Sequence, residues 1–287
     1  MKSASSGREA AVERMTVGFD GTEASFVALD WAAQRASGRP IQVEIATVDV
    51  ADLFAEDVVD DALEDAVRRF RNIAPDAEVS ATDFAGRMPG ALLHAARLSD
   101  LLVIGAHHRR PVRSALTGWR PLRIVSHSEV PIVVVPDDWT DTSGPILVGI
   151  DDDDSSSGAV EFASAEAAAS GVALTLLHAW RMPGPTMDGS VALLPSPIEE
   201  KAAQRRVLDR VCAQVVETHP EVKVDCILAR DSPSPALLTE SRRSSLLVIG
   251  THRRGLLAGS FLGSVGQDVL VEARVPICVV PATASTP

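Results

Sequence analysis

The sequence predicts an α/β protein built from two tandem, doubly wound, Rossmann-like domains, each with a five-stranded, mostly parallel sheet flanked by helices. Three observations predict it. The length of 287 residues suits two domains of about 100–200 residues each. The chain repeats itself, and within each copy short apolar runs alternate with helical patterns. We place domain 1 at residues 1–140 and domain 2 at residues 141–287.

The internal repeat is clearest in the later strands of each copy. Two apolar segments of the first copy recur 145 residues further on, and the second of them keeps six of its seven residues. The pairs are Leu101–Gly105 with Leu246–Gly250, and Val130–Pro136 with Val275–Pro281.

The start of each copy repeats at a different offset. Val17–Asp20 matches Val148–Asp151, 131 residues apart, so the second copy gains 14 residues before its fourth strand. Residues 181–197 are rich in proline and glycine, which is typical of a loop. We therefore place the insertion there.

Each copy is expected to alternate strands and helices. The strands are short apolar runs without alternation, as in parallel strands buried on both faces. The first helix is expected at residues 23–36 after an N-cap at Thr22, and its counterpart at residues 157–169 after Asp154 and Ser155. The strands are expected at 15–20, 41–48, 77–84, 101–105 and 131–135, then at 145–150, 172–179, 222–228, 246–250 and 276–280.

The segment after the fourth strand of the second copy has the chemistry of an anion site. It runs from Gly250 to Ser264, with two glycines near its end, and leads into a helix. Glycine lets the backbone approach a phosphate, and free N–H groups at a helix start attract negative charge. Ser264 adds a hydroxyl donor, and Arg253 and Arg254 add positive charge. The alternative is a glycine-rich turn that only reverses the chain.

An aspartate ends the first strand of each copy. These residues are Asp20 and Asp151. A carboxylate at this place in a doubly wound sheet accepts hydrogen bonds from ribose hydroxyls. The alternative is a turn residue or the N-cap of the next helix, the role expected for Asp152, Asp153 and Asp154.

Taken together, these parts resemble the universal stress protein family. The resemblance rests on the strand that ends in aspartate, the helix that contains Ala28–Ala32, the Gly250–Ser264 segment and the closing Val275–Pro281, and it covers about residues 15–281. It implies a tandem member that binds an adenine nucleotide, ATP, with Mg²⁺ as a possible companion. The implied contacts are Ile150 and Ala179 for adenine, Asp151 for the adenosine, Gly250, His252 and Arg253 for ribose and phosphates, and Gly263, Ser264 and Val265 for phosphates.

The two copies depart from the family motif Gly-x2-Gly-x9-Gly-(Ser/Thr) to different degrees. The second copy replaces only the second glycine, with Arg253. The first copy keeps the outer glycines but has His108 at the second glycine and Trp119 at the hydroxyl position. We expect domain 1 to bind nucleotide weakly or not at all. Its candidate residues are Asp20, Gly105 and Gly118.

The last strand of each copy is apolar, β-branched and bounded by proline. Such an edge strand invites pairing. In the family, two domains pair through this strand, so the resemblance implies an intramolecular pseudo-dimer, and two chains can associate further as a homodimer.

Composition narrows the classes of partner and compartment. The net charge is -12, with 27 basic and 39 acidic residues, which disfavours nucleic acid. No apolar run approaches the roughly 18 residues of a membrane span, and no signal peptide is expected at the start. Cys212, Cys226 and Cys278 form no CxxC motif, and this odd, unpaired set predicts apolar filler in a reducing, cytoplasmic environment.

The functional hypothesis is a stress-response binding module. It holds ATP in domain 2 and acts through nucleotide-dependent conformation or partner binding. No catalytic residue and no metal site are expected, because no general base is evident near the terminal phosphate and the histidines lack ligand spacing. A slow ATPase in the same pocket and a nucleotide-free scaffold are the alternatives.

Overall fold

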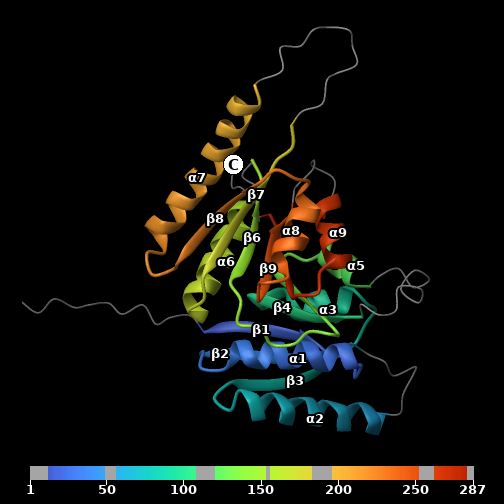
Figure 1. Ribbon diagram of the computed structural model, residues 1–287. Coiled ribbons are helices and arrows are strands. Elements are labelled where there is room, and N and C mark those ends of the chain that lie inside the picture. The colour runs from blue at the N-terminus through green and yellow to red at the C-terminus, as the bar shows by residue number, and fades with distance from the viewer. Residues whose placement is uncertain are drawn as a thin grey trace, which may run out of the picture.

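A single ten-stranded sheet runs through both halves of the chain (Figure 1). The computed structural model describes residues 12–48, 56–107, 120–152, 156–182, 196–251 and 262–282. The strands of the first half are β1 Glu13–Gly18, β2 Ile41–Val48, β3 Glu78–Phe84, β4 Leu101–Ala106 and β5 Ile132–Pro136. Those of the second half are β6 Ile146–Ile150, β7 Leu174–Ala179, β8 Val224–Ala229, β9 Leu246–Gly250 and β10 Ile277–Val280. Every strand lies within two residues of its expected bounds.

The strand order is β3-β2-β1-β4-β5-β10-β9-β6-β7-β8. All pairs within a half are parallel, whereas β5 and β10 pair antiparallel, with Cys278 opposite Val133. The expected fold class is therefore confirmed, including the pairing of the two halves through their last strands. β-branched residues line this central seam, because each strand there is covered on both faces.

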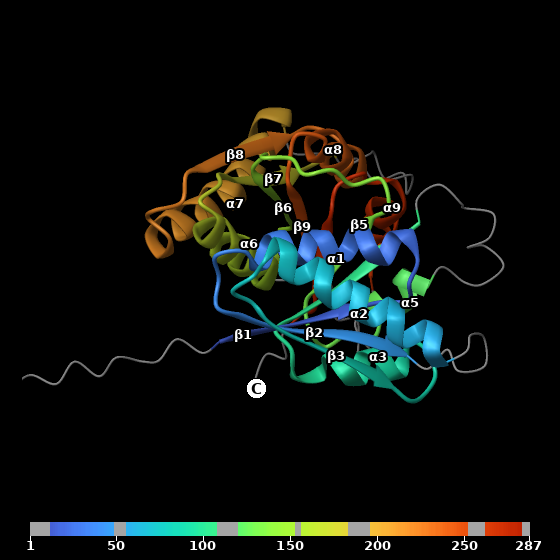
Figure 2. The same cartoon turned by 90° about the horizontal axis from the view of Figure 1, so that it is seen from below.

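Helices cover both faces of the sheet (Figure 2). One face packs against α1 Glu23–Ala36, α2 Glu56–Ile73, α6 Ser157–Ser170 and α7 Pro197–Thr218. The other packs against α3 Gly90–Ala95, the short 3₁₀ helix η1 Ala96–Leu98, α5 Arg120–Val125, α8 Pro233–Ser241 and α9 Ser264–Glu272. In β4, Leu101 and Val103 join the first core while Leu102 and Ile104 join the second, as the two-residue period of a strand requires. None of the helices in the described part of the chain is long and apolar enough to span a membrane.

The helix starts follow the sequence signals in part. Thr22 caps α1, and its side chain accepts a hydrogen bond from the Ser25 amide at 3.3 Å, as expected. The counterpart helix α6 has Ser156 at its N-cap, and this side chain makes no capping hydrogen bond. Asp154, the expected N-cap residue, and Ser155 lie outside the described residues.

The cysteines depart from expectation. Cys212 on α7 and Cys226 on β8 form a disulfide, so the prediction of an unpaired set was wrong for these two residues. They are 14 positions apart without a recognisable motif, and they meet only because α7 packs along β8. Cys278 is fully buried in β10 as a free thiol, which agrees with its expected role as apolar filler.

Candidate functional site

The first and fourth strands of domain 2 part at their carboxyl ends. β6 and β9 pair from Ile146 with Leu246 through Val148 with Val248, yet both strands continue for two more residues. β7 lies on the other side of β6, so the strand order reverses here. In open α/β sheets, ligands bind in the crevice beyond the carboxyl ends of the strands at such a switch point.

Two candidate residues end β6. Ile150 is buried, and its carbonyl oxygen accepts a hydrogen bond from Nδ1 of His178 at 2.9 Å. Asp151 is exposed, and its Oδ1 accepts from the Asp152 amide at 2.9 Å. Its own amide donates to Oγ of Ser156 at 3.4 Å. Asp151 thus shapes the turn before α6 while its side chain stays at the surface, beside the crevice.

His178 connects the end of β6 to α7. His178 is 3% exposed, and its Nε2 lies 2.7 Å from Oε1 of Gln204. The Gln204 amide in turn donates to Oε1 of Glu200 at 2.8 Å. This chain of polar contacts holds α7 against the strand end that is expected to meet adenine.

A tryptophan and an arginine lie beside the expected adenine contact at Ala179, and sequence reasoning missed both. Ala179 ends β7 opposite Ala229. The next residue, Trp180, is buried, and its amide donates to the Ala229 carbonyl at 2.9 Å. The Arg230 guanidinium lies 5.7 Å from the centre of the Trp180 ring, a cation–π contact. Both side chains directly follow strand ends, which was the available signal.

Hydrogen bonds to β10 and to the residues after it hold the end of β9 in place. Gly250 pairs with Val280 of β10, and the Thr251 amide donates to the Val280 carbonyl at 3.0 Å. Thr251 is buried, and its hydroxyl accepts from the Ala282 amide at 2.9 Å. The predicted contacts His252 and Arg253 lie outside the described residues.

The three expected phosphate contacts form the amino end of α9. Gly263 is the N-cap in an extended conformation, and as a glycine it contributes no side-chain capping hydrogen bond. A Cβ added to Gly263 would meet no atom within 4 Å. Ser264 is exposed and Val265 half-buried. This end therefore offers backbone N–H groups, a positive helix dipole and a hydroxyl, which is the donor set that a phosphate requires.

The corresponding candidate residues of domain 1 have different surroundings. Oδ1 of Asp20 accepts hydrogen bonds within its own turn, from the Thr22 amide at 3.1 Å and from the Thr22 hydroxyl at 2.6 Å. This geometry matches the turn alternative for Asp20. A Cβ on Gly105 would clash with the carbonyl of Ala24, so α1 itself demands glycine there. Gly118 lies outside the described residues.

The described residues contain no group of three or more His, Cys, Asp or Glu side chains arranged to hold a metal ion.

Known proteins resemble the chain over nearly its whole length. The universal stress protein family matches twice, at residues 11–136 and 143–281. Universal stress protein Rv1996 of Mycobacterium tuberculosis is 29% identical, and the alignment covers 92% of this chain and 94% of that protein. A universal stress protein of Mycolicibacterium smegmatis is 30% identical, with 92% and 95% covered.

The structural comparison agrees with this architecture. The crystal structure of a universal stress protein from Archaeoglobus fulgidus superposes with a TM-score of 0.68 at 18% identity, covering 95% of this chain and 97% of that one. At this identity the match supports the fold alone. With the two sequence matches of the family along one polypeptide, it leads to one conclusion: the chain belongs to the universal stress protein family and carries two of its domains in tandem.

Proposed function

We propose that domain 2 binds an adenine nucleotide, ATP, and that the protein acts as a stress-response module through nucleotide-dependent conformation or partner binding. The observation that carries the proposal is the amino end of α9, where the N-cap residue Gly263 has no side chain of its own to bond the first-turn amides. An anion there gains both hydrogen bonds and the favourable end of the helix dipole, about 0.3–2 kcal/mol for the dipole alone.

The remaining contacts follow from the strand ends. Asp151 would accept from the ribose, the backbone at Ile150 and Ala179 would meet adenine, and Gly250 would let the phosphates pass close to β9. His252 and Arg253 would face ribose and phosphates. Because the phosphate groups of ATP are negatively charged, their oxygens would be the chief ligands of Mg²⁺.

Conformational output would run through α7. The end of β6 is joined to this helix by His178 and Gln204, so a ligand that moves the Ile150 backbone also strains those contacts. Domain 1 would contribute little nucleotide binding, because its motif has His108 at the second glycine and Trp119 at the hydroxyl position. We place this activity in the cytoplasm, where adenine nucleotides are the available ligands.

The pairing of β5 with β10 favours an intramolecular pseudo-dimer as the working unit. Further association into a homodimer would leave this seam intact. The mass of the chain in solution, measured by light scattering, checks whether one or two copies are present.

The nucleotide test uses a substitution that the fold tolerates. We expect denatured, freshly purified protein to release about one equivalent of adenine nucleotide. Gly263→Leu should abolish the release, because the leucine side chain would occupy the space proposed for the phosphates. The fold should tolerate the leucine, since a Cβ at this position meets no atom within 4 Å. Gly90→Leu is the matched control, since an added Cβ there also meets nothing within 4 Å. Unchanged nucleotide content in Gly263→Leu would refute the placement, and two equivalents in the wild type would refute the assignment to domain 2 alone.

A further inference from the structure

A disulfide ties α7 to the edge of the sheet. β8 is the last strand in the sheet order, next to β7, and α7 packs along it (Figure 1). Cys212 on α7 is bonded to Cys226 on β8. Both cysteines are half-buried, whereas Cys278 is fully buried. The bridge therefore lies at the outer margin of domain 2, where a small thiol reaches a disulfide more easily than it would in a core.

The other packing of α7 is thin. Among its 22 residues only Leu208 and Val215 are buried, and Cys212 lies between them at helical spacing, on the same face of the helix. Segments with few buried apolar contacts open locally at a low cost in free energy. The disulfide therefore provides a large part of the attachment of this helix.

The counterpart helix of domain 1 is held without a disulfide. At the offset of 145 residues, Val67 of α2 corresponds to Cys212. Ala81 of β3 corresponds to Cys226 in the same way. The bridge is thus a feature of one copy of the repeat, and α2 provides an internal comparison for α7.

α2 has non-covalent contacts at positions where α7 has weaker side chains. Phe70 of α2 is fully buried, and the corresponding residue of α7 is the smaller Val215. Arg69 forms a bidentate ion pair with Asp30 of α1, at 2.5 and 2.6 Å. The residue of α7 that corresponds to Arg69 is the uncharged Gln214. Domain 2 therefore relies on a covalent bond where domain 1 uses apolar packing and charge.

α7 also contacts the end of β6, at the candidate nucleotide site. Gln204 precedes Cys212 by about two helical turns, and its Oε1 lies 2.7 Å from Nε2 of His178. Nδ1 of His178 lies 2.9 Å from the carbonyl oxygen of Ile150. A displacement of α7 would therefore disturb the contacts of the imidazole that bonds the end of β6.

We propose that Cys212 and Cys226 form a reversible redox switch, which fastens α7 to β8 when oxidised and releases α7 when reduced. In reduction, one thiolate of a small dithiol attacks one sulfur of the bridge, and the other cysteine leaves and takes up a proton. The second thiolate of the dithiol then attacks the mixed disulfide. The dithiol ends as a cyclic disulfide and both cysteines end as thiols. Exchange with a small oxidised disulfide reverses the step.

The switch has a local and a remote consequence. The local one, the release of α7, does not depend on any nucleotide. The remote one, weaker binding of ATP by the reduced protein, rests on the proposed function, because it needs the nucleotide at the end of β6. The proposed cytoplasmic location favours a switch over a permanent staple, since disulfides there are usually transient or redox-sensing.

Hydrogen–deuterium exchange of the full chain, without nucleotide, tests the local consequence. Dithiothreitol should reduce the bridge in the native protein, as counted by alkylation, and peptides of α7 should then exchange at least about tenfold faster. Peptides of α2 should not change, and oxidised glutathione should restore slow exchange in α7. A bridge that resists reduction until denaturant is added would overturn the proposal, as would equal exchange of α7 in the two states.

Variants separate the bridge from other effects of the reductant. The double variant Cys212→Ala with Cys226→Ala should exchange in α7 as fast as the reduced wild type, and dithiothreitol should not change it further. Cys278→Ala keeps the bridge and should respond as the wild type does. A response of the double variant to dithiothreitol would contradict the proposal. The wild-type comparison remains decisive if a variant fails to fold.

Calorimetric titration of the oxidised and the reduced protein with ATP tests the remote consequence. We expect reduction to weaken binding by about fivefold or more, the lower end of typical coupling between two sites. Equal affinity in the two states would refute the coupling through His178. Absence of ATP binding in both states would refute the proposed function, while the exchange experiment would still decide whether the disulfide switches α7.

Discussion

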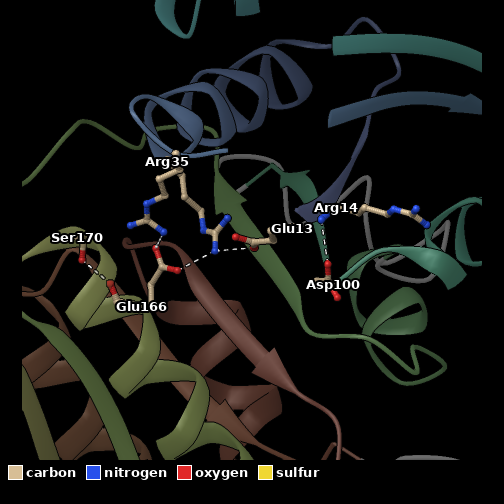
Figure 3. Close-up of polar contacts among 7 residues, drawn as sticks. Glu13, Arg14, Arg35, Asp100, Glu166 and Ser170 are labelled. Carbon is tan, nitrogen blue, oxygen red and sulfur yellow. Dashed lines mark hydrogen bonds and ion pairs between the residues drawn. The ribbon is translucent and has the colours of Figure 1, made fainter. Parts of the chain in front are cut away.

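Arg35 and Glu166 hold equivalent positions in the two sequence copies, and they bind each other across the domain boundary at 2.7 Å (Figure 3). They are 131 residues apart, the same offset that relates Val17 to Val148. In a symmetric pair of identical domains, a residue at this place would approach its own copy and meet a like charge. Opposite charges therefore favour the pairing of domain 1 with domain 2 over pairing of like domains.

The first prediction concerns this contact. Glu166→Gln removes the charge that Arg35 and Arg39 share, and it leaves a buried guanidinium with less compensation. Breaking a buried ion pair from one side typically costs about 3–5 kcal/mol. We expect the free energy of unfolding, measured by urea denaturation, to fall by that order. Glu161→Gln, at an exposed position of the same helix, should change it by less than about 0.5 kcal/mol.

Reversing both charges provides a further check on the same pair. Arg35→Glu alone should destabilise strongly because three carboxylates then meet. Adding Glu166→Arg should recover part of that loss, although Glu13 and Arg39 still favour the original arrangement. A double variant no more stable than Arg35→Glu would argue against direct pairing.

The second prediction separates a structural role of Gly105 from a ligand role. A Cβ at this position would clash with the backbone of Ala24, which cannot rotate away as a side chain can. We expect Gly105→Ala to lower the free energy of unfolding by about 1–3 kcal/mol, even without nucleotide. Gly90→Ala places the same methyl group in open space within a helix and should be neutral or stabilising. Equal stability of the two variants would contradict the close packing of α1 on β4.

The third prediction concerns the disulfide between Cys212 and Cys226. Alkylation under denaturing, non-reducing conditions should modify only Cys278, and prior reduction should expose three thiols, as counted by mass spectrometry. A bridge that closes a loop of this size stabilises by about 3 kcal/mol. The double substitution to alanine should therefore lower the midpoint of urea denaturation. Three modified thiols without reduction would show that the pair stays reduced.

The fourth prediction follows from the burial of Cys278. Burial raises the pKa of this thiol well above its ordinary value. The unfolded chain loses the thiol proton above about pH 8.5, whereas the folded chain keeps it, so unfolding becomes easier as pH rises. Cys278 should contribute a decline approaching 1.4 kcal/mol per pH unit between its unfolded and folded pKa. The measurement is urea denaturation at several pH values between 8 and 10, in non-reducing buffer.

Cys278→Ala is the comparison for that series. It should start less stable, because a buried sulfur is lost from the seam between β5 and β10, but its stability should decline less steeply over the same pH range. Identical slopes in the two proteins would show that Cys278 ionises with an ordinary pKa.

Much of the local structure could be predicted from local signals. The helix at residues 23–36 has the expected bounds because Thr22 supplies a cap and apolar residues recur at helical spacing. The apolar run at 246–250 is a strand with the expected bounds. The candidate positions Asp151, Gly250 and Gly263 could be selected for the same reason, since strand ends and helix starts are local features.

Long-range partners could not be predicted in this way. The sequence around Arg35 does not identify Glu166 as its partner, and the sequence around Cys212 does not identify Cys226. Both contacts depend on how the helices pack in the folded protein. Trp180 and Arg230 meet because β7 and β8 end side by side.

By itself, the sequence determined the tandem repeat, the alternation of strands and helices and the places along the chain of the glycines and aspartates proposed to bind nucleotide. These depend on residue type and on spacings of a few residues, which determine the local conformation of the backbone. Only the tertiary structure decided the antiparallel direction and register of the expected pairing between β5 and β10, and the ion cluster around Glu166. Those features join residues more than a hundred positions apart, so they exist only once both domains have packed against each other.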